Sequence, residues 1–166
     1  MCALPKQAAT SNRSTITEPA VDRLWPLSEL HEFMATADAV VVTLPLTEST
    51  RGLVGAQALS AMRADAVLIN VGRGPVIDEQ ALFDALQQRR IAGAVIDTWY
   101  QYPGHAQAQC APSRLDFAGL DNLVMTPHMS GWTEGTVRRR QQTLADNITR
   151  LAQGQPLINV LRPAQT

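Results

Sequence analysis

The sequence contains few of the residues that mark several functional classes. Its 166 residues include only two cysteines, Cys2 and Cys110, with no C-x-x-C spacing, so neither a disulfide framework nor a metal site is expected and a reducing compartment is favoured. No apolar run approaches the roughly 20 residues that a membrane span needs, and no charged segment precedes an apolar stretch at the N-terminus, as in a secretory signal. The formal net charge of −1 provides no polybasic field for nucleic acid or an anionic membrane. These absences favour a cytoplasmic α/β or α+β domain without nucleic-acid or membrane partners.

What the sequence does contain is an alternation of short β-branched runs with longer helical stretches. Four runs lack polar alternation, which predicts strands that are buried on both faces; they are residues 39–43, 66–70, 93–97 and 123–126. Between them, Ser28 is expected to cap one helix and Asp78 another, over 79–88, with a short helix at 55–62. Strands that alternate with helices predict a parallel, doubly wound sheet.

Patterning divides the chain into three parts. The first is poorly patterned, with a possible strand remnant at Met1 to Leu4, and the last is a long helix from Thr133 to about Gln153, closed by Gly154, and a tail. The predicted boundaries are 1–25, 26–132 and 133–166. The connection over 98–120 is too long for an ordinary βα loop, which indicates a functional or disordered segment.

Three chemically active side chains follow the predicted strands. Arg73 follows the second run, Asp97 ends the third and His128 follows the fourth. Ligands of parallel sheets bind beyond the C-terminal ends of the strands, so these side chains are expected at one edge. Together they suit an anionic substrate with a polarised carbonyl and a proton to transfer.

Four linked runs carry a family resemblance. They follow one another in the order ADAVVVTLPLTESTRGLVG, AVLINVGRGPVIDEQALFDAL, IAGAVIDTW and NLVMTPHMSGWT. Over about residues 27–163 the chain resembles the D-isomer-specific 2-hydroxyacid dehydrogenase family, and several motifs in register are far more specific than one short pattern. The resemblance implies a Rossmann-like parallel sheet, NAD or NADP as cofactor, and hydride transfer to or from a small 2-keto or 2-hydroxy acid.

The resemblance also implies roles for individual residues. Arg73 matches the arginine that binds the substrate carboxylate and polarises its carbonyl, since a guanidinium binds carboxylates bidentately. His128 matches the residue that donates or accepts the proton, and Asp97 the one that bonds the nicotinamide carboxamide. The other positions that match cofactor-binding segments are Thr43, Leu44, Pro45, Val71, Gly72, Ser130 and Gly131.

The sequence departs from the family pattern in the loop after the third strand. Tyr102 occupies the position where relatives carry a glutamate that pairs with the catalytic histidine. A phenol can hydrogen-bond to His128 but carries no charge at neutral pH, so the imidazolium would lose a stabilising carboxylate. Activity with a shifted pH optimum and loss of activity both remain open.

A second departure concerns the cofactor's pyrophosphate. No G-x-G-x-x-G turn occurs in the sequence, so the N-terminal glycine-rich βαβ unit of a Rossmann domain is missing. Lys6 or Arg13 could face a 2′-phosphate or could simply be solvated. We therefore expect a truncated dehydrogenase; the alternative is a non-catalytic remnant or interaction protein. In either case the exposed sheet edge favours a homodimer or other self-association.

Overall fold

The structure is a computed structural model that describes residues 2–3, 21–104 and 110–160. The chain separates into two compact units, Met1–His128 and Met129–Thr166, and the three-part division made above stays a prediction. Among the helices that these residues form, none combines the length and the hydropathy that crossing a bilayer requires.

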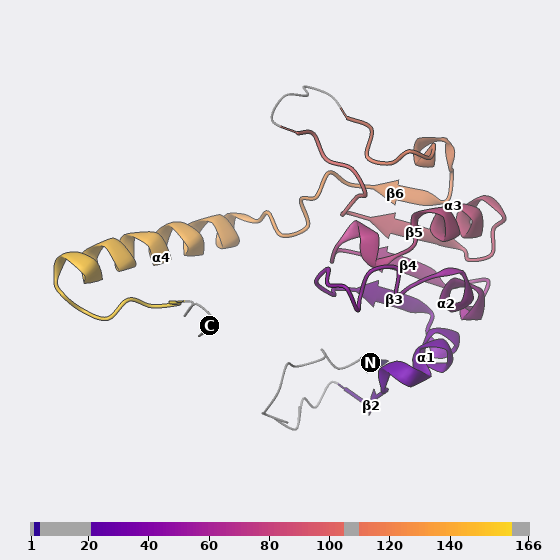
Figure 1. Cartoon of the computed structure of the whole chain (residues 1–166), viewed down its shortest axis with the longest axis horizontal. Coiled ribbons are helices and arrows are strands. Elements are labelled where there is room, and N and C mark those ends of the chain that lie inside the picture. Colours follow the sequence, from indigo (N-terminus) through magenta and orange to yellow (C-terminus); the bar gives the residue numbers. More distant parts are fainter. Residues whose placement is uncertain (1, 4–20, 105–109, 161–166) are drawn as a thin grey trace. The chain divides into compact units, whose positions relative to one another are not determined.

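The first unit is built on an open parallel sheet of four strands (Figure 1). In spatial order these strands are β3 (Ala39–Val42), β4 (Val67–Asn70), β5 (Gly93–Ile96) and β6 (Leu123–Met125). Every neighbouring pair is parallel. Each of the four predicted runs forms a strand, and the predicted α/β class is confirmed.

Short helices precede and connect these strands. They are η1 (Leu27–Glu29), α1 (Leu30–Thr36), α2 (Ala56–Ala61), η2 (Gly74–Val76), α3 (Glu79–Gln87) and η3 (Phe117–Gly119). Asp78 caps α3 as predicted, because its carboxylate accepts a hydrogen bond of 2.8 Å from the Ala81 amide. Ser28 caps nothing: Pro26, with a φ of −67°, precedes η1, so Ser28 already lies inside the 3₁₀ turn.

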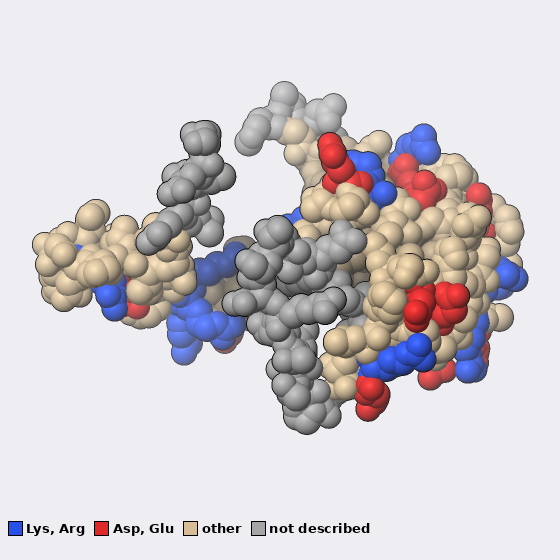
Figure 2. All heavy atoms as spheres, turned by 60° about the horizontal axis from the view of Figure 1, so that its bottom comes forward, with Lys and Arg blue, Asp and Glu red and all other residues tan. Residues whose placement is uncertain are grey.

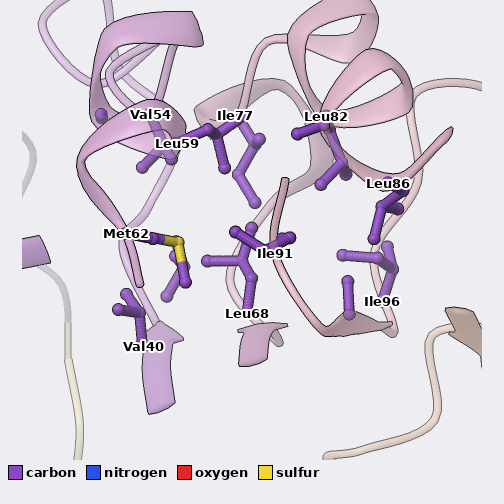
Figure 3. Close-up of a cluster of buried hydrophobic side chains, with 14 of the residues drawn as sticks. Val40, Val54, Leu59, Met62, Leu68, Ile77, Leu82, Leu86, Ile91 and Ile96 are labelled. Atoms are coloured by element: carbon purple, nitrogen blue, oxygen red, sulfur yellow. The ribbon is translucent and has the colours of Figure 1, made fainter. Parts of the chain in front are cut away.

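The core lies between one face of the sheet and the helices that cover it (Figure 3). The strands and helices both contribute fully buried aliphatic side chains, among them Leu68, Ile96, Leu59, Leu82 and Leu86. Each such side chain contributes about 1.5–3 kcal/mol relative to an exposed one. This packing fixes the strands whose ends carry the predicted site.

The opposite face of the sheet is partly open. Val41 in β3 and Val124 in β6 are 54% and 56% exposed. The prediction that every run is buried on both faces is therefore wrong for these two strands. The reason is that α1, α2 and α3 pack against one another in sequence, which covers one face of the sheet.

A small second sheet involves the N-terminal segment. β1 (Cys2–Ala3) pairs in parallel with β2 (Arg23–Leu24), so these two residues of the predicted segment form a strand. That this strand is a remnant stays a prediction. Met1, Leu4, Lys6 and Arg13 lie outside the described residues.

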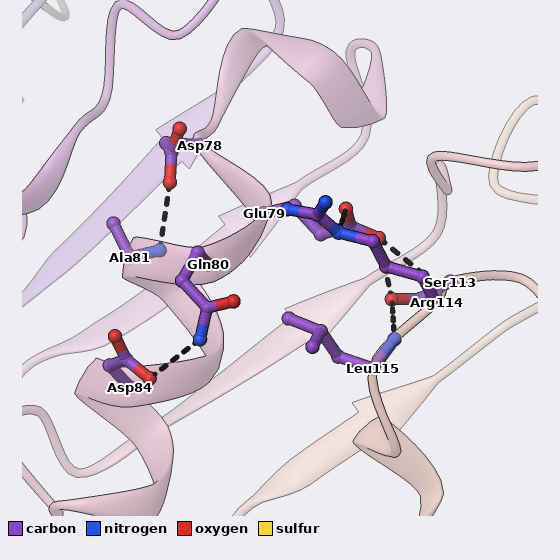
Figure 4. A network of polar contacts seen from close by, with 8 residues as sticks. All are labelled: Asp78, Glu79, Gln80, Ala81, Asp84, Ser113, Arg114 and Leu115. Atoms are coloured by element: carbon purple, nitrogen blue, oxygen red, sulfur yellow. Dashed lines mark hydrogen bonds and ion pairs between the residues drawn. The ribbon is translucent and has the colours of Figure 1, made fainter.

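The long connection after β5 is anchored to the start of α3 (Figure 4). The Glu79 carboxylate accepts a hydrogen bond of 2.7 Å from the Ser113 hydroxyl and forms an ion pair of 2.8 Å with Arg114. Phe117 is buried and packs edge-on against Trp99, with ring centroids 5.7 Å apart. The described parts of this connection thus pack against the rest of the first unit. Residues 105–109 lie outside the described residues.

The second unit consists of one long helix and a returning tail. α4 (Glu134–Ala152) begins at Thr133, whose hydroxyl accepts a hydrogen bond from the Thr136 amide, and it is followed by Gly154 at a φ of +65°. The start of the helix at Thr133 and its closure by Gly154 were predicted from the sequence, whereas the capping hydrogen bond of Thr133 was not. The tail is held by two hydrogen bonds between the Asn147 side chain and the backbone of Ile158.

Candidate functional site

The carboxyl ends of the four parallel strands bring the predicted side chains to one edge of the sheet. Arg73 lies three residues beyond β4, Asp97 directly follows β5, and His128 lies three residues beyond β6. Thr43, Leu44 and Pro45 follow β3 at the same edge. The arginine, the aspartate and the histidine thus follow the carboxyl ends of adjacent strands, at the edge where ligands of parallel sheets bind. Their convergence in one site stays a prediction.

The loop that carries Arg73 is held by a buried asparagine. Asn70, the last residue of β4, is 1% exposed. Its side-chain oxygen accepts from the Gly72 amide at 3.0 Å, and its side-chain nitrogen donates to the Arg73 carbonyl at 3.1 Å. Arg73 itself is exposed and donates to the Gly72 carbonyl at 2.6 Å. A fixed backbone therefore presents an exposed guanidinium.

The two glycines beside Arg73 lie too close to neighbouring backbone to carry a side chain. A Cβ atom on Gly72 would stand 2.7 Å from the Leu44 carbonyl oxygen, and one on Gly74 would overlap the Trp99 carbonyl. The first contact is with the chain beyond β3 and the second with the chain beyond β5. The Arg73 loop is consequently pressed between the ends of both neighbouring strands.

His128 is hydrogen-bonded to the tyrosine that the sequence singled out. The Tyr102 hydroxyl lies 3.1 Å from His128 Nδ1, and the backbone amide of Trp99 donates to the same hydroxyl at 2.9 Å. His128 has a φ of +58°. Such a conformation is unusual for a residue other than glycine and is enriched at functional sites.

Asp97 is buried and faces the segment that leads to His128. It is 2% exposed, and its carboxylate accepts a hydrogen bond of 2.6 Å from the Thr126 hydroxyl. The Thr126 carbonyl in turn accepts from the Trp99 indole nitrogen at 3.0 Å. β5 and the residues after β6 are thereby tied together at the edge of the sheet.

The residues predicted to line a cofactor differ in exposure. Thr43 and Pro45 are exposed, Leu44 and Val71 are half-buried, and Gly72 is buried. A hollow of about 630 Å³ runs along α1 and β3, and its lining includes Thr43 and Leu44 but not Arg73 or His128. Ser130 and Gly131 belong to the second unit, where both are exposed.

Charges around the described surface are mixed. Figure 2 shows basic and acidic side chains interspersed over the face of the first unit that it presents. Within residues 2–3, 21–104 and 110–160, histidine, cysteine, aspartate and glutamate form no group of three that could hold a metal ion. The arrangement provides a cation and a hydrogen-bonded imidazole, which are the groups for binding an anion and moving a proton.

Three residues that shape the site were not singled out from the sequence as site residues. Asn70, Trp99 and Thr126 make the hydrogen bonds that hold the Arg73 and His128 segments. A polar side chain at the last position of an apolar strand is a usable signal for Asn70, since a buried amide needs partners. No sequence signal identifies the hydrogen bonds of Thr126 with Trp99 and Asp97, because these pairs are 27 and 29 residues apart.

Comparison with known proteins decides the family. Residues 6–130 match the model of the D-isomer specific 2-hydroxyacid dehydrogenase, NAD binding domain. The chain belongs to this family. It is 35% identical over 136 residues to (S)-sulfolactate dehydrogenase of Chromohalobacter salexigens, which covers 80% of this chain and 42% of that protein. It is 36% identical over 134 residues to glyoxylate/hydroxypyruvate reductase B of Yersinia pestis, with 81% and 39% covered.

A solved structure of the family shares the fold. It is the D-isomer specific 2-hydroxyacid dehydrogenase from Xanthobacter autotrophicus Py2 in complex with NADPH and MES, which has 31% identity and a TM-score of 0.70. The alignment covers 98% of this chain and 60% of that one. The chain thus has the partial Rossmann-like sheet expected from its sequence, and it spans about two fifths of the length of the two curated relatives.

Proposed function

We propose that the chain is the catalytic-edge part of an NAD(P)-dependent 2-hydroxyacid dehydrogenase. The observation that supports this most directly is the hydrogen bond between Tyr102 and His128 Nδ1 at the edge that also carries Arg73. With Nδ1 engaged, Nε2 is the nitrogen that can exchange a proton with a substrate. The named relatives and the NADPH-bound structure support the oxidoreductase class and the cofactor.

In this proposal each residue has one task. Arg73 binds the carboxylate of a small 2-keto or 2-hydroxy acid through its fork of donors and polarises the adjacent carbonyl. His128 gives a proton to the carbonyl oxygen during reduction and takes it back during oxidation, with Tyr102 holding its ring. The nicotinamide, when bound, exchanges a hydride with the substrate carbon C2.

The described residues fit the nicotinamide end of the cofactor better than its phosphates. Leu44, Pro45 and Val71 offer apolar side chains at the ends of adjacent strands, and Asp97 is the proposed partner of the carboxamide. The cofactor contacts of Ser130 and Gly131, which belong to the second unit, stay predictions from the sequence. The sequence has no glycine-rich turn for the pyrophosphate. We therefore expect the cofactor to bind these residues more weakly than it binds a protein that carries this turn.

Calorimetric titration with NADH and with NADPH, followed by assays with glyoxylate and hydroxypyruvate, tests the proposal. Micromolar cofactor binding with turnover supports it, and the preferred cofactor and substrate follow from the same data. Millimolar or absent binding without turnover contradicts it. The two cysteines without C-x-x-C spacing favour the cytoplasm as the compartment.

A non-catalytic role is the second candidate, and the exposed apolar side chains of the sheet favour it. Val41 and Val124 leave apolar surface on one face of the first unit. Such surface, and an open edge at β3, promote association between copies of the chain. We propose self-association in either case, and only the absence of cofactor binding selects the non-catalytic role.

A further inference from the structure

We infer that Trp99 is the positioning residue of the His128 site. Its backbone amide donates to the Tyr102 hydroxyl at 2.9 Å, and its indole nitrogen donates to the Thr126 carbonyl at 3.0 Å. Tyr102 is the partner of the imidazole, and Thr126 lies two residues before His128. One residue thus holds both sides of the contact between the phenol and the imidazole. The inference rests on the proposed function of His128.

The Trp99 amide favours one direction for the hydrogen bond between Tyr102 and His128. A backbone amide can only donate, so the Tyr102 oxygen accepts from Trp99. The single phenolic proton is then available to His128 Nδ1, 3.1 Å away. A neutral imidazole that accepts at Nδ1 carries its proton on Nε2. Trp99 therefore favours, through Tyr102, the tautomer of the neutral His128 ring that carries its proton on Nε2.

The indole ring of Trp99 is itself held in place. It is 5% exposed and packs edge-on against the buried Phe117 ring. Phe117 also packs edge-on against Phe83 of α3, with centroids 5.3 Å apart. Because the ring cannot turn freely, its nitrogen stays directed at the Thr126 carbonyl. Trp99→Phe keeps an aromatic ring at this position, although a smaller one, and loses this donor.

Trp99 also contacts the loop of the proposed carboxylate-binding residue. Gly74, next to Arg73, approaches the Trp99 carbonyl so closely that a Cβ atom would overlap it. This contact uses backbone atoms alone, so it survives a change of the Trp99 side chain. Replacing the indole is consequently expected to disturb His128 and to leave Arg73 in place.

The chain contains a matched control for this replacement. Trp25 is also buried, at 7% exposure, and its indole nitrogen has no hydrogen-bond partner among the residues that the structure describes. Trp25→Phe and Trp99→Phe each remove one buried indole N–H, but only the second removes a hydrogen bond. The readout is the rate at which diethyl pyrocarbonate, which attacks unprotonated imidazole nitrogen, modifies His128, measured by mass spectrometry against the exposed His31 in the same sample.

We expect Trp99→Phe to raise this relative rate at least about threefold, as the loss of one net hydrogen bond predicts, and Trp25→Phe to leave it unchanged. Equal rates in the two variants overturn the inference. If Trp99→Phe does not fold, Tyr102→Phe provides the test, because Tyr102 is 50% exposed. It should speed hydrogen exchange of the Trp99 backbone amide about threefold to tenfold, and an unchanged rate overturns the inference.

Neither measurement needs turnover, so its outcome is separate from that of the proposed function. A chain that binds no NADH but shows both rate changes keeps the inference and loses the proposal. A chain that turns over substrate but shows neither rate change keeps the proposed function and loses the inference about Trp99. Where turnover is present, Trp99→Phe should lower kcat and leave KM for the keto acid nearly unchanged, because Arg73 keeps its position.

Discussion

At the scale of single residues, the contact between Gly74 and Trp99 determines where Arg73 can lie. Gly74→Ala should lower the free energy of unfolding by roughly 1–3 kcal/mol, because its methyl group would overlap the Trp99 carbonyl. Gly104→Ala is the control, since a Cβ atom at Gly104 meets nothing within 4 Å. Urea denaturation measures the free energy of unfolding of both variants. Equal stability of the two variants would show that the Arg73 loop can shift away from the end of β5.

The guanidinium of Arg73 should decide substrate affinity if the proposed function is correct. Arg73→Gln removes the charge, and a charge-assisted hydrogen bond is worth about 1.5–3 kcal/mol. We expect KM for glyoxylate to rise at least about tenfold in saturation kinetics with the preferred cofactor. Arg89→Gln, which removes an exposed arginine paired with Asp121, should leave KM unchanged. A similar KM in both variants would remove Arg73 from the site.

Tyr100 should make the fold sensitive to alkali. Burial raises the pKa of its phenol, and the nearby Glu79 and Asp78 carboxylates raise it further. Above about pH 10 the unfolded chain loses this proton while the folded chain keeps it, so stability falls as pH rises. The loss should approach about 1.4 kcal/mol per pH unit in denaturant titrations and be smaller in Tyr100→Phe. Parallel curves for the two proteins would contradict the assignment.

At the scale of elements, the start of α3 offers a paired test of capping. Asp78 accepts from the Ala81 backbone amide, whereas Asp84 accepts from the Gln80 side chain one turn away (Figure 4). Asp78→Ala should cost about 0.5–2 kcal/mol of stability, and Asp84→Ala only about 0.2–0.5 kcal/mol. Thermal unfolding of both variants measures these two losses of stability. A larger loss in Asp84→Ala than in Asp78→Ala would exclude a capping role for Asp78.

Local patterns predicted most of the elements because the information lies within each segment. β-branched runs gave the four strands, and Asp78 and Thr133 marked the starts of α3 and α4. Ser28 misled because Pro26 starts the turn earlier. The burial of Val41 was predicted wrongly because exposure depends on which layers cover the sheet, and a strand's own sequence does not encode that.

Some features of the candidate site could likewise be predicted from the sequence, and others could not. The positions of Arg73, Asp97 and His128 at one edge follow from strand order alone. The hydrogen bond from the Trp99 indole to the Thr126 carbonyl could not be predicted, because it joins residues that are 27 positions apart. The bond from the Trp99 amide to Tyr102 spans three residues and depends on the local conformation of the connection after β5. Long-range side-chain partners require the packed structure, whereas edge placement requires only the topology.

At the scale of the whole molecule, the open face of the sheet should govern association. Val41 is 54% exposed on β3, at the edge of the sheet. A lysine on an edge strand opposes pairing and adds charge to an apolar face. We therefore expect Val41→Lys to shift sedimentation-velocity profiles toward the monomer at concentrations where the unmodified chain associates.

Ala35→Lys on the exposed surface of α1 adds the same charge away from that face and is the control. It should associate like the unmodified chain, because net charge alone acts weakly on a contact built from apolar surface. If both lysine variants dissociate equally, general repulsion explains the effect. If neither does, association uses a surface other than the open face of the sheet, and β3 is then available to a different partner.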